Sequence, residues 1–390
     1  MPLHRSTFCG AQTVESFRAI RVLKRHKLSR SALNRGQKLA CGTKGRLNSI
    51  VRPACYSPSE LDLTQNGPVQ AAFHERAAAV TRETFGKSVF VRGVVELSNF
   101  CRQNCHYCGM RRDNRGLHRF RAQLDQLAEL LIEHRPACIT DVNLQAGEDP
   151  VAVRELVLPL LGILKRETRL GLSVCLGSLA PELYEALQAA GASFYVMKFE
   201  CSNHLRYDQL SGPGTLAERT EHIHRLAANG WHVSSGFIAG LPGETPQDLV
   251  ANLRFADALP LSGCSVSPFV PGETTPLAAQ PPGDLNWTLN CIAALRLLRP
   301  EWIIPAVSAL NIPERDGYCR GLRAGANLAT INLTPNEMRE NYVIYKRDRF
   351  IMTEQRVLDA IAAEGLEPSR RSLADFFSHP QDEPAAPLLA

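Results

Sequence analysis

The chain has 390 residues, of which 44% are hydrophobic, enough for one large α/β domain or two ordinary ones. No run approaches the roughly 18 to 20 consecutive apolar residues of a membrane span, and no apolar segment near the start resembles a secretory signal. Twelve cysteines in such a chain are more typical of thiols or metal ligands than of a disulfide framework, which belongs to short secreted domains. The composition therefore argues against a membrane-embedded or secreted protein and predicts a reducing compartment.

The net charge of +5 is a property of the N-terminal region. Residues 1–59 hold twelve Lys and Arg against the single acid Glu15, a net +11, which leaves −6 on the other 331 residues. The body thus lacks the basic surplus that a nucleic-acid partner requires. The basic segment fits either an organellar transit peptide or a disordered upstream extension. We therefore set it apart from the fold and expect a cytoplasmic protein, or one of an organelle matrix, that is not secreted.

From residue 90 onward, β-type and helix-type segments alternate, after helical segments at 59–63 and 69–80. We expect strands at 90–97, 137–144, 170–176, 193–199, 231–238, 262–267, 302–308 and 327–332. We expect helices near 122–134, 151–167, 180–190, 215–229, 244–257, 283–298 and 314–324. This alternation predicts an α/β fold with a parallel sheet, and eight strands favour a closed TIM-type (β/α)8 barrel over an open doubly wound sheet.

The predicted organisation has three parts. A basic extension covers 1–59, the barrel with its preceding helix covers 60–360, and a disordered tail covers 361–390, where proline is frequent after His379. Within the barrel, the Pro- and Gly-rich stretch 268–282 is expected to be a long loop at the rim.

Three cysteines, Cys101, Cys105 and Cys108, directly follow the first predicted strand. In a (β/α)8 barrel the groups that do chemistry lie at the C-terminal ends of the strands, so these thiols are expected at that rim. Their C-x3-C-x2-C spacing suits a cubane iron–sulfur cluster with one iron left open, whereas a zinc site needs a fourth Cys or His within reach. His106 is adjacent to two of the ligands, and its ring is expected to point away.

This motif, with the aromatic Tyr107 before the last cysteine, resembles that of the radical SAM superfamily. The resemblance implies that Cys101, Cys105 and Cys108 bind one [4Fe-4S] cluster whose open iron chelates the amino and carboxylate groups of S-adenosylmethionine (SAM). It further implies that an electron from the cluster cleaves SAM to a 5′-deoxyadenosyl radical. Within the superfamily, the chain looks most like HydE, the [FeFe] hydrogenase maturase, in a branch with biotin synthase and methylornithine synthase. The similarity spans about 88–340 and is carried by 92–101, 108–114, 144–150, 323–328 and 332–335.

The stretch Gln-Ala-Gly-Glu-Asp at the end of the second predicted strand resembles the motif that grips the methionine amino group through backbone carbonyls. Its residues Gln145, Gly147 and Glu148 are therefore expected at the cofactor, and a glycine suits a place where backbone approaches a ligand closely. The same stretch also predicts an ordinary helix start, with Asp149 as the N-cap and Pro150 as the first helical residue.

Three further residues, two at later strand ends and one in the expected helix near 215–229, have counterparts in the family. Glu200 resembles the carboxylate that binds the ribose hydroxyls, and its alternative is a solvated acid at the rim. Arg219 resembles the guanidinium that pairs with the methionine carboxylate, and its alternative is a surface arginine. Ile238, in Gly-Phe-Ile-Ala-Gly, resembles the residue that packs on adenine. Together with Tyr107, these residues form the expected SAM site.

The other cysteines decide whether a second cluster is expected. Biotin synthase carries a sulfur-donating cluster on three strand cysteines and an arginine. Here only Cys175 matches such a position, Ser234 stands at another, and Pro305 occupies the approximate place of the arginine. A cluster of that type is therefore not expected, and Cys175 is equally well explained as a small residue lining the barrel. The auxiliary C-terminal cysteine triad of some HydE proteins is not recognisable.

Five more cysteines and several arginines have weaker signals. Cys201 and Cys319 lie at predicted rims, within reach of a substrate or an auxiliary cluster. The cysteines expected in the core are Cys138, Cys264 and Cys291. Four residues that follow the cluster motif have two alternative roles: Met110, Arg111, Arg112 and Arg119. They either present charge to an anionic substrate, or stabilise the loop or a contact with a reductase.

The resemblance therefore implies a radical SAM enzyme of cofactor assembly. Its substrate is expected to be a small molecule or a metal cofactor held in the barrel, and its electron donor a protein such as ferredoxin or flavodoxin, with no nucleic-acid or membrane partner. The alternatives are sulfur insertion into an aliphatic chain, as by lipoyl or biotin synthase, and rearrangement of an amino-acid skeleton. The non-enzyme alternative is an iron–sulfur binding module. No catalytic residue is assigned beyond the ligands of the cluster and of SAM.

Overall fold

The computed structural model describes residues 56–347 and 350–378. Its strands are β1 (Ser88–Ser98), β2 (Asp141–Ala146), β3 (Gly171–Cys175), β4 (Phe194–Val196), β5 (His232–Ala239), β6 (Gly263–Pro268), β7 (Leu328–Asn332) and β8 (Glu367–Pro368). The expectations for 1–55 and for 379–390 fall outside the described residues and stay predictions.

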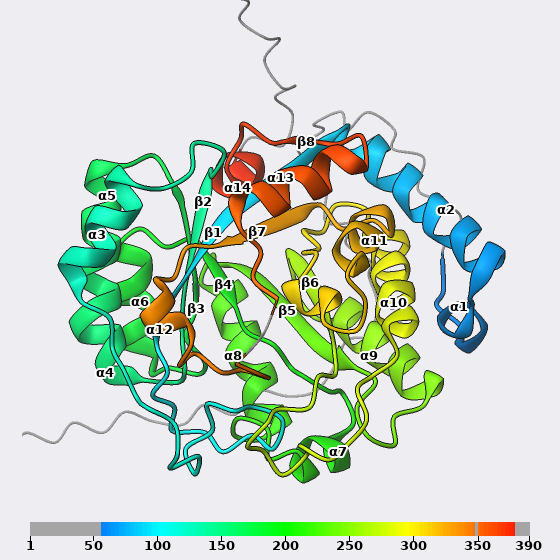
Figure 1. Cartoon of the computed structure of the whole chain (residues 1–390), viewed down its shortest axis with the longest axis horizontal. Coiled ribbons are helices and arrows are strands. Elements are labelled where there is room, and N and C mark those ends of the chain that lie inside the picture. The colour runs from blue at the N-terminus through cyan, green and yellow to red at the C-terminus, as the bar shows by residue number, and fades with distance from the viewer. Residues whose placement is uncertain (1–55, 348–349, 379–390) are drawn as a thin grey trace, which may run out of the picture. The chain divides into compact units, whose positions relative to one another are not determined.

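Helices surround the sheet on its outer side (Figure 1). They are α1 (Glu60–Thr64), α2 (Gly67–Phe85), α3 (Leu124–Glu133), α4 (Pro150–Ala152), α5 (Leu158–Glu167), α6 (Pro181–Ala189), α7 (His204–Gln209), α8 (Leu216–Ala228), α9 (Pro246–Ala258), α10 (Leu285–Leu298), α11 (Gly317–Arg323), α12 (Asn336–Arg339), α13 (Glu354–Ala363) and α14 (Leu373–Ser378). A π-helical turn, η1 (Val153–Val157), joins α4 to α5, and a 3-10 helix, η2 (Ser308–Asn311), precedes α11. Among the described residues, no helix is both long and apolar enough to cross a bilayer.

The main sheet is parallel, with the strand order β6-β5-β4-β3-β2-β1-β7. Between β6 and β7 runs the segment 302–306, where Ile303 bridges Gly263 of β6 and Pro305 bridges Leu328 of β7. These bridges join the two edges of the sheet, so the predicted α/β barrel is confirmed. The strand expected at 302–308 is reduced to isolated bridges, since Pro305 has no N–H with which to extend a ladder.

The barrel strands alternate between two faces, as the period of two requires. The residues that face the helices and form the core on β1, β2, β6 and β7 are Val91, Val95, Leu97, Val142, Leu144, Cys264, Val266, Ala329 and Ile331. The residues that face the barrel interior on the same strands are Arg92, Val94, Glu96, Asn143, Gln145, Ser265, Ser267, Leu328, Thr330 and Asn332. One face of these strands is therefore apolar and the other mostly polar, so the barrel interior is suited to polar ligands.

Local sequence explains how several helices begin. Thr215 and Glu218 form a reciprocal capping box at the start of α8, and Thr245 and Asp248 form another at α9. The predicted helix near 151–167 is interrupted by the π-helical turn η1, which lies just before Pro159. A proline inside a helix lacks the N–H for the regular bond, and the wider turn accommodates it.

The tail expected to be disordered from residue 361 is instead ordered as far as Ser378. β8 pairs with the start of β1 through Ser88 and Glu367, and the backbone N–H of Leu373 in α14 donates to both carboxylate oxygens of Asp141, at 3.0 and 3.1 Å. The ring of Phe376 lies 5.4 Å from that of Phe90, centroid to centroid. The expectation was wrong because these contacts are tertiary, and the composition of a short terminal segment does not reveal them.

Candidate active site

A cavity of about 340 Å³ lies inside the barrel and is open at the C-terminal ends of the strands. All ten residues that the sequence singled out for the cluster and for SAM line it: Cys101, Cys105, Tyr107, Cys108, Gln145, Gly147, Glu148, Glu200, Arg219 and Ile238. They come from five separate parts of the chain, namely the loop after β1, the ends of β2, β4 and β5, and helix α8. The structure therefore brings together every residue of the predicted site.

The loop that carries the cysteines is braced from within. Arg119 donates hydrogen bonds to the carbonyls of Met110 and Arg111, at 2.8 and 2.7 Å, and Asn99 donates to the carbonyl of His118 at 2.8 Å. Arg111 donates to Asn104. None of the arginines that the sequence left open, Arg111, Arg112 and Arg119, lines the cavity. Arg111 and Arg119 therefore stabilise the loop.

The three thiols fit a shared cationic cluster. They are free of disulfides, and burial raises their pKa values, that of Cys105 to about 12, with a further contribution from neighbouring cysteines at Cys105 and Cys108. A buried group of thiols of this kind needs a positive centre before it loses its protons, and metal binding supplies one. The backbone N–H of Glu148 donates to the sulfur of Cys101 at 3.4 Å. His106, as expected, points away, since its ring bonds Ser211.

Glu148 ties the cysteine loop to the next strand ends. One carboxylate oxygen accepts from the Arg102 guanidinium at 2.6 Å and from the Gln103 amide at 2.7 Å, and the other accepts from the backbone N–H of Ser178 at 3.1 Å. Gly147 lets the two segments meet, because a Cβ there would lie 2.2 Å from the Phe100 carbonyl oxygen. The expected helix start is confirmed, since Asp149 caps α4. The Gln-Ala-Gly-Glu-Asp stretch thus serves as the mechanical support of the loop.

Glu200 has an unusual backbone. Its φ is +61°, in the left-handed region of backbone conformation. Residues other than glycine rarely adopt this conformation, because it costs conformational energy. Bonds on both sides hold it there, because its N–H donates to the Gly236 carbonyl and its own carbonyl accepts from the Ile238 N–H, each at 3.0 Å. The carboxylate of Glu200 forms no hydrogen bond or ion pair with the described residues, so its oxygens are available to a ligand in the cavity.

Arg219 is buried at 6% exposure and reaches the cavity from α8. Its Nε donates to the Lys198 carbonyl at 2.8 Å and its Nη1 to the Ser178 hydroxyl at 3.0 Å, whereas Nη2 forms no hydrogen bond with the described residues. Burial alone would lower its pKa, but Tyr207, Glu148 and Glu200 outweigh burial and raise it. A fixed guanidinium with a free amino group suits a carboxylate ligand.

An apolar wall completes this side of the cavity. Ile238, Phe269 and Leu241 are buried in one cluster, and the partly buried ring of Tyr107 packs against it. Two aromatic rings and an isoleucine side by side offer the flat, apolar surface on which a planar ring system can lie. Ile238, expected at adenine, and Tyr107, expected at the SAM site from the cysteine motif, therefore belong to the same wall.

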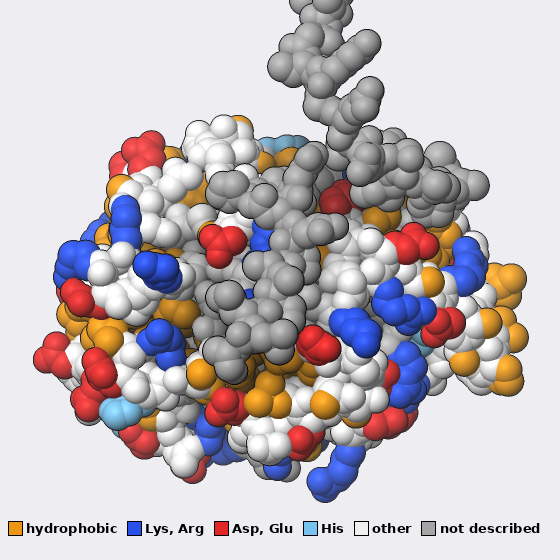
Figure 2. All heavy atoms as spheres, turned by 90° about the horizontal axis from the view of Figure 1, so that it is seen from above, with side chains coloured by type: hydrophobic (Ala, Val, Ile, Leu, Met, Phe, Trp, Pro, Cys, Tyr) orange, Lys and Arg blue, Asp and Glu red, His pale blue; other side chains and the backbone are white. Residues whose placement is uncertain are grey.

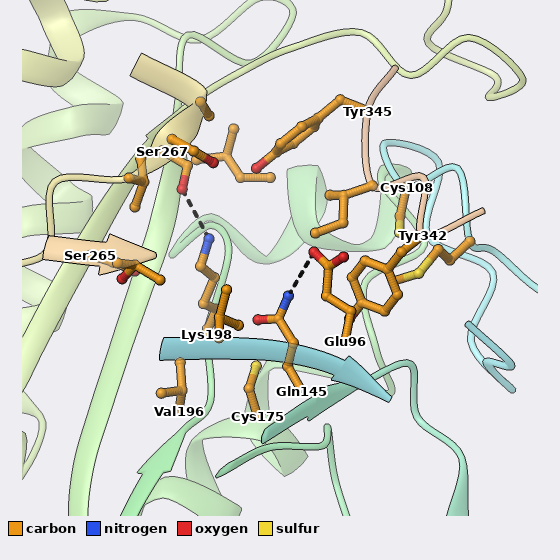
Figure 3. A pocket seen from close by; sticks show the side chains of 18 of the residues that line it. Glu96, Cys108, Gln145, Cys175, Val196, Lys198, Ser265, Ser267, Tyr342 and Tyr345 are labelled. Atoms are coloured by element: carbon orange, nitrogen blue, oxygen red, sulfur yellow. Dashed lines mark hydrogen bonds between the residues drawn. The ribbon is translucent and has the colours of Figure 1, made fainter. Parts of the chain in front are cut away.

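Sequence reasoning missed the polar side chains deeper in the barrel. Glu96 accepts from the Gln145 amide at 3.5 Å, and Lys198 donates to the Ser267 hydroxyl at 3.0 Å, and all four side chains project into the same space (Figure 3). Burial disfavours the charged form of Lys198, but the attraction of Glu200 and other groups raises its pKa. The sequence did contain a pattern that indicates these residues, because charged and polar residues occupy every second position of strands that are otherwise apolar.

The remaining cysteines divide by location. Cys175 lines the cavity, together with Ser234 and Pro305, so the departures from the biotin synthase pattern lie in the cavity itself. Cys201 is buried against Ile238 and does not line the cavity. Cys319 lies on α11 and does not line the cavity either, so neither thiol is placed to contact a substrate or cluster in it.

Of the three cysteines expected in the core, Cys264 and Cys291 are fully buried there, as predicted. Cys138 is only partly buried, because β2 begins at Asp141, and its thiol donates to Glu354 at 3.7 Å.

Comparison with known proteins agrees with this geometry. The radical SAM superfamily profile matches residues 95–256. The [FeFe] hydrogenase maturase subunit HydE of Thermotoga maritima is 32% identical over 288 residues, which cover 73% of this chain and 81% of that protein. The chain belongs to the radical SAM superfamily. The 3-methylornithine synthase of Methanosarcina barkeri is 26% identical over 78% of this chain and 86% of its own. The crystal structure of a methylornithine synthase matches the fold with a TM-score of 0.73 at 24% identity, over 83% of this chain and 97% of that one.

Membership of this superfamily identifies the chain as an enzyme that uses a [4Fe-4S] cluster and SAM in small-molecule chemistry. The alternative of a non-catalytic iron–sulfur module is therefore wrong.

On the face shown in Figure 2, acidic and basic side chains of the described residues are interspersed rather than gathered by sign.

Proposed function

We propose that Cys101, Cys105 and Cys108 hold the [4Fe-4S] cluster and that SAM lies beside it against the wall of the cavity. The observation that carries the proposal is that ten residues chosen from five separate stretches of the chain line one cavity. A chance set from five parts of the chain would be scattered over the barrel. When bound by these cysteines, the cluster would supply the one electron needed to cleave SAM to methionine and a 5′-deoxyadenosyl radical.

The protein's own groups would position the cofactor. The carboxylate of Glu200 offers two strong acceptors to the hydroxyls of a ribose, and the free Nη2 of Arg219 offers a donor to the methionine carboxylate. Tyr107 and Ile238 form the surface for adenine. The barrel strands surround the sides of the cavity, so the fixed polar groups act there with greater strength than they would in open water.

The substrate is proposed to occupy the space beneath SAM. That space is lined by Glu96, Lys198, Ser265, Ser267 and Asn332, which offer both charges and several hydroxyl and amide groups. An apolar chain would displace water from these groups and offer no hydrogen bond in return, which is costly in a buried site. A polar or charged substrate is therefore favoured.

Assembly of a metal cofactor, as in HydE, is the proposed role. HydE is the relative with 32% identity over most of both chains, and the quoted stretches near the cavity look like it. Rearrangement of an amino-acid skeleton is the second candidate, favoured by similarity to 3-methylornithine synthase over 78% of this chain. Sulfur insertion has less support, because Ser234 and Pro305 line the same cavity as Cys175 at places where the biotin synthase pattern has cluster ligands.

The site is tested by SAM cleavage with the anaerobically reconstituted protein. With dithionite as reductant, we expect 5′-deoxyadenosine to form, and Glu200→Gln to raise the SAM dissociation constant at least tenfold while about four irons per chain are retained. A charge-assisted bond to a diol is worth roughly 1.5 to 3 kcal/mol, consistent with that loss. Unchanged SAM affinity in Glu200→Gln would remove Glu200 from the proposed site, and about eight irons per chain would revive sulfur insertion.

The physiological electron donor is proposed to be an acidic protein such as ferredoxin or flavodoxin. The cysteine loop exposes Arg102 and Arg112, whose side chains are 55% and 61% accessible, and Arg115 is also exposed. In the same assay, added salt should slow cleavage supported by such a donor and leave dithionite-supported cleavage unchanged. Equal salt sensitivity of the two reactions would contradict a docking role for these arginines.

A further inference from the structure

Two turns carry the residues proposed to hold the nucleoside part of SAM. Glu200 lies in the turn after β4, and Ile238 lies near the end of β5, directly before the turn at Gly240. Their backbones are joined by the two bonds at Glu200 described above, but the rest of each turn extends beyond the sheet. The positions of a carboxylate and an apolar wall must both be correct for one nucleoside to fit, so what fixes the two turns relative to each other matters for binding.

A buried chain of three side chains connects these turns. Glu244 accepts from the backbone N–H groups of Gly240 and Leu241, at 2.6 and 3.2 Å, through one carboxylate oxygen. Its other oxygen accepts from the Asn252 amide at 3.2 Å. The Asn252 carbonyl oxygen in turn accepts from both the backbone N–H and the hydroxyl of Ser202, at 2.8 and 2.7 Å. The chain therefore runs from the turn after β5, through α9, to the turn after β4.

The direction of every bond in this chain is determined. The backbone N–H of Ser202 only donates, so the oxygen of the Asn252 amide must face it, and the nitrogen then faces Glu244. Asn252 is 1% exposed and Glu244 is 8% exposed, so water has little access to replace a lost partner. Changing a donor to an acceptor at one link would leave two like groups facing each other in a buried place.

A second, independent contact holds the same two turns together. Arg206 of α7 donates to the carbonyls of Pro242 and Gly243, at 2.6 and 2.9 Å, and pairs with Asp248 at 3.1 Å. Because this contact does not involve Asn252, loss of the buried chain should change the spacing of the turns without unfolding the region.

We propose that Asn252 is a positioning residue for SAM, which it serves through Glu244 and Ser202 by fixing the ribose-binding turn at Glu200 relative to the adenine wall at Ile238. Neither Asn252 nor Glu244 lines the cavity, so the effect is exerted entirely through the two turns. The inference rests on the proposed function, because it takes Glu200 and Ile238 to be nucleoside contacts.

Because the direction of each bond is fixed, the proposal can be tested by exchanging the carboxylate of Glu244 and the amide of Asn252. Glu244→Gln places an amide nitrogen against the Asn252 nitrogen, and Asn252→Asp places a second carboxylate against Glu244. The double variant E244Q/N252D restores every bond with the same net charge. In it, the new amide accepts from the Gly240 turn through its oxygen and donates through its nitrogen to the new carboxylate, which accepts from Ser202. Asn290, which is equally buried and bonds Gln70 and His74 on the far side of α10, supplies a matched control through Asn290→Asp.

The experiment uses the full chain with its cluster reconstituted, and measures the SAM dissociation constant by calorimetry without reductant, the iron content, and the melting temperature. We expect each single variant, E244Q and N252D, to weaken SAM binding at least fivefold with unchanged iron content, and the double variant to return to within about twofold of the parent. Asn290→Asp should lower the melting temperature without weakening SAM binding. Amide hydrogen exchange should be faster at residues 200–202 and 240–241 in the single variants only.

Three outcomes would overturn the inference: SAM affinity unchanged in both single variants, a double variant no better than the worse single one, or SAM affinity that merely follows the melting temperature across all four variants. Should a single variant not fold, Ser202→Ala replaces it, because it removes only the hydroxyl bond and should weaken binding about twofold. Glu200→Gln distinguishes failure of the positioning role of Asn252 from failure of the proposed SAM site. If it weakens SAM binding while the single variants do not, only the positioning role fails, and if it has no effect, the proposed site itself fails.

Discussion

The two ends of the barrel are built from the same strands but from different residues. The C-terminal end holds the three thiols of the cysteine loop, the strained Glu200 and a guanidinium around an open cavity. The N-terminal end is closed by an apolar cluster of Phe90, Ile303, Leu328 and Leu373, with Phe85, Phe376 and Phe377 packed against it. The cysteine loop and α14 lie at opposite ends of the sheet in Figure 1. The protein thus separates its chemistry from much of its stability along the strand axis, as barrels commonly do.

The largest expected effect is at a cysteine of the cavity. Cys105→Ala should abolish both iron binding at the site and SAM cleavage, because the cluster then keeps two protein ligands instead of three. The fold should persist, since the loop is also held by Arg119 and Glu148. Iron analysis, 5′-deoxyadenosine formation and circular dichroism measure the three quantities.

Cys291→Ala is the matched control for this substitution. Cys291 is fully buried in α10, away from the cavity, so its loss should lower stability by about 1 kcal/mol and leave iron content and cleavage unchanged. Retained iron and activity in Cys105→Ala would contradict the ligand assignment, and lost iron in Cys291→Ala would contradict the separation of core from site.

Sequence reasoning located the C-terminal end of the barrel better than the N-terminal end, for a physical reason. The residues of the site lie in contiguous motifs, each directly after a strand, so one strand prediction places a whole motif at the rim. The thiols of the cysteine loop and Gly147 are examples. The closing cluster, in contrast, joins Phe90 to Phe376, which are far apart in the chain, and no local pattern announces such a contact.

The sequence prediction also failed at two other features of the barrel, the segment 302–306 and the polar residues of the interior. The segment 302–306 completes the ring with only two bridges, because Pro305 limits its pairing, so a strand was expected where little regular structure forms. The inward-facing Glu96 and Lys198 were overlooked, because buried parallel strands are expected to be apolar throughout. Their alternation with apolar neighbours marked the cavity, and it is the one signal that was available and unused.

An intermediate effect is expected at the N-terminal end. Phe376→Ala removes a partly buried ring that packs on Phe85 and Phe90, at centroid distances of 5.5 and 5.4 Å. Fully buried Phe→Ala substitutions cost roughly 3 to 5 kcal/mol, so about 2 kcal/mol is expected at this partly buried position. Denaturant unfolding measures the loss, and SAM cleavage per folded molecule should be unchanged. A variant that binds SAM more weakly but is as stable as the parent would show that the two ends are coupled.

The smallest expected effect is a pH dependence of stability at the same end. Burial raises the pKa of Asp141 to about 6, although bonds from Thr140 and from the Leu373 N–H oppose it. A carboxyl group whose pKa is higher in the folded state than in the unfolded state stabilises the fold when protonated, and this contribution disappears as the pH rises through about 6. Asp141→Asn, which stays neutral, should therefore gain about 1 kcal/mol relative to the parent between pH 5 and pH 8. Urea unfolding at the two pH values measures the difference, with Asp257→Asn as a control at a half-exposed surface pair. A stability difference between Asp141→Asn and the parent that does not change with pH would mean that Asp141 keeps its charge in the folded state. The N–H group of α14 and Arg92 would then hold that charge, and α14 would be attached by electrostatic interactions rather than by apolar packing.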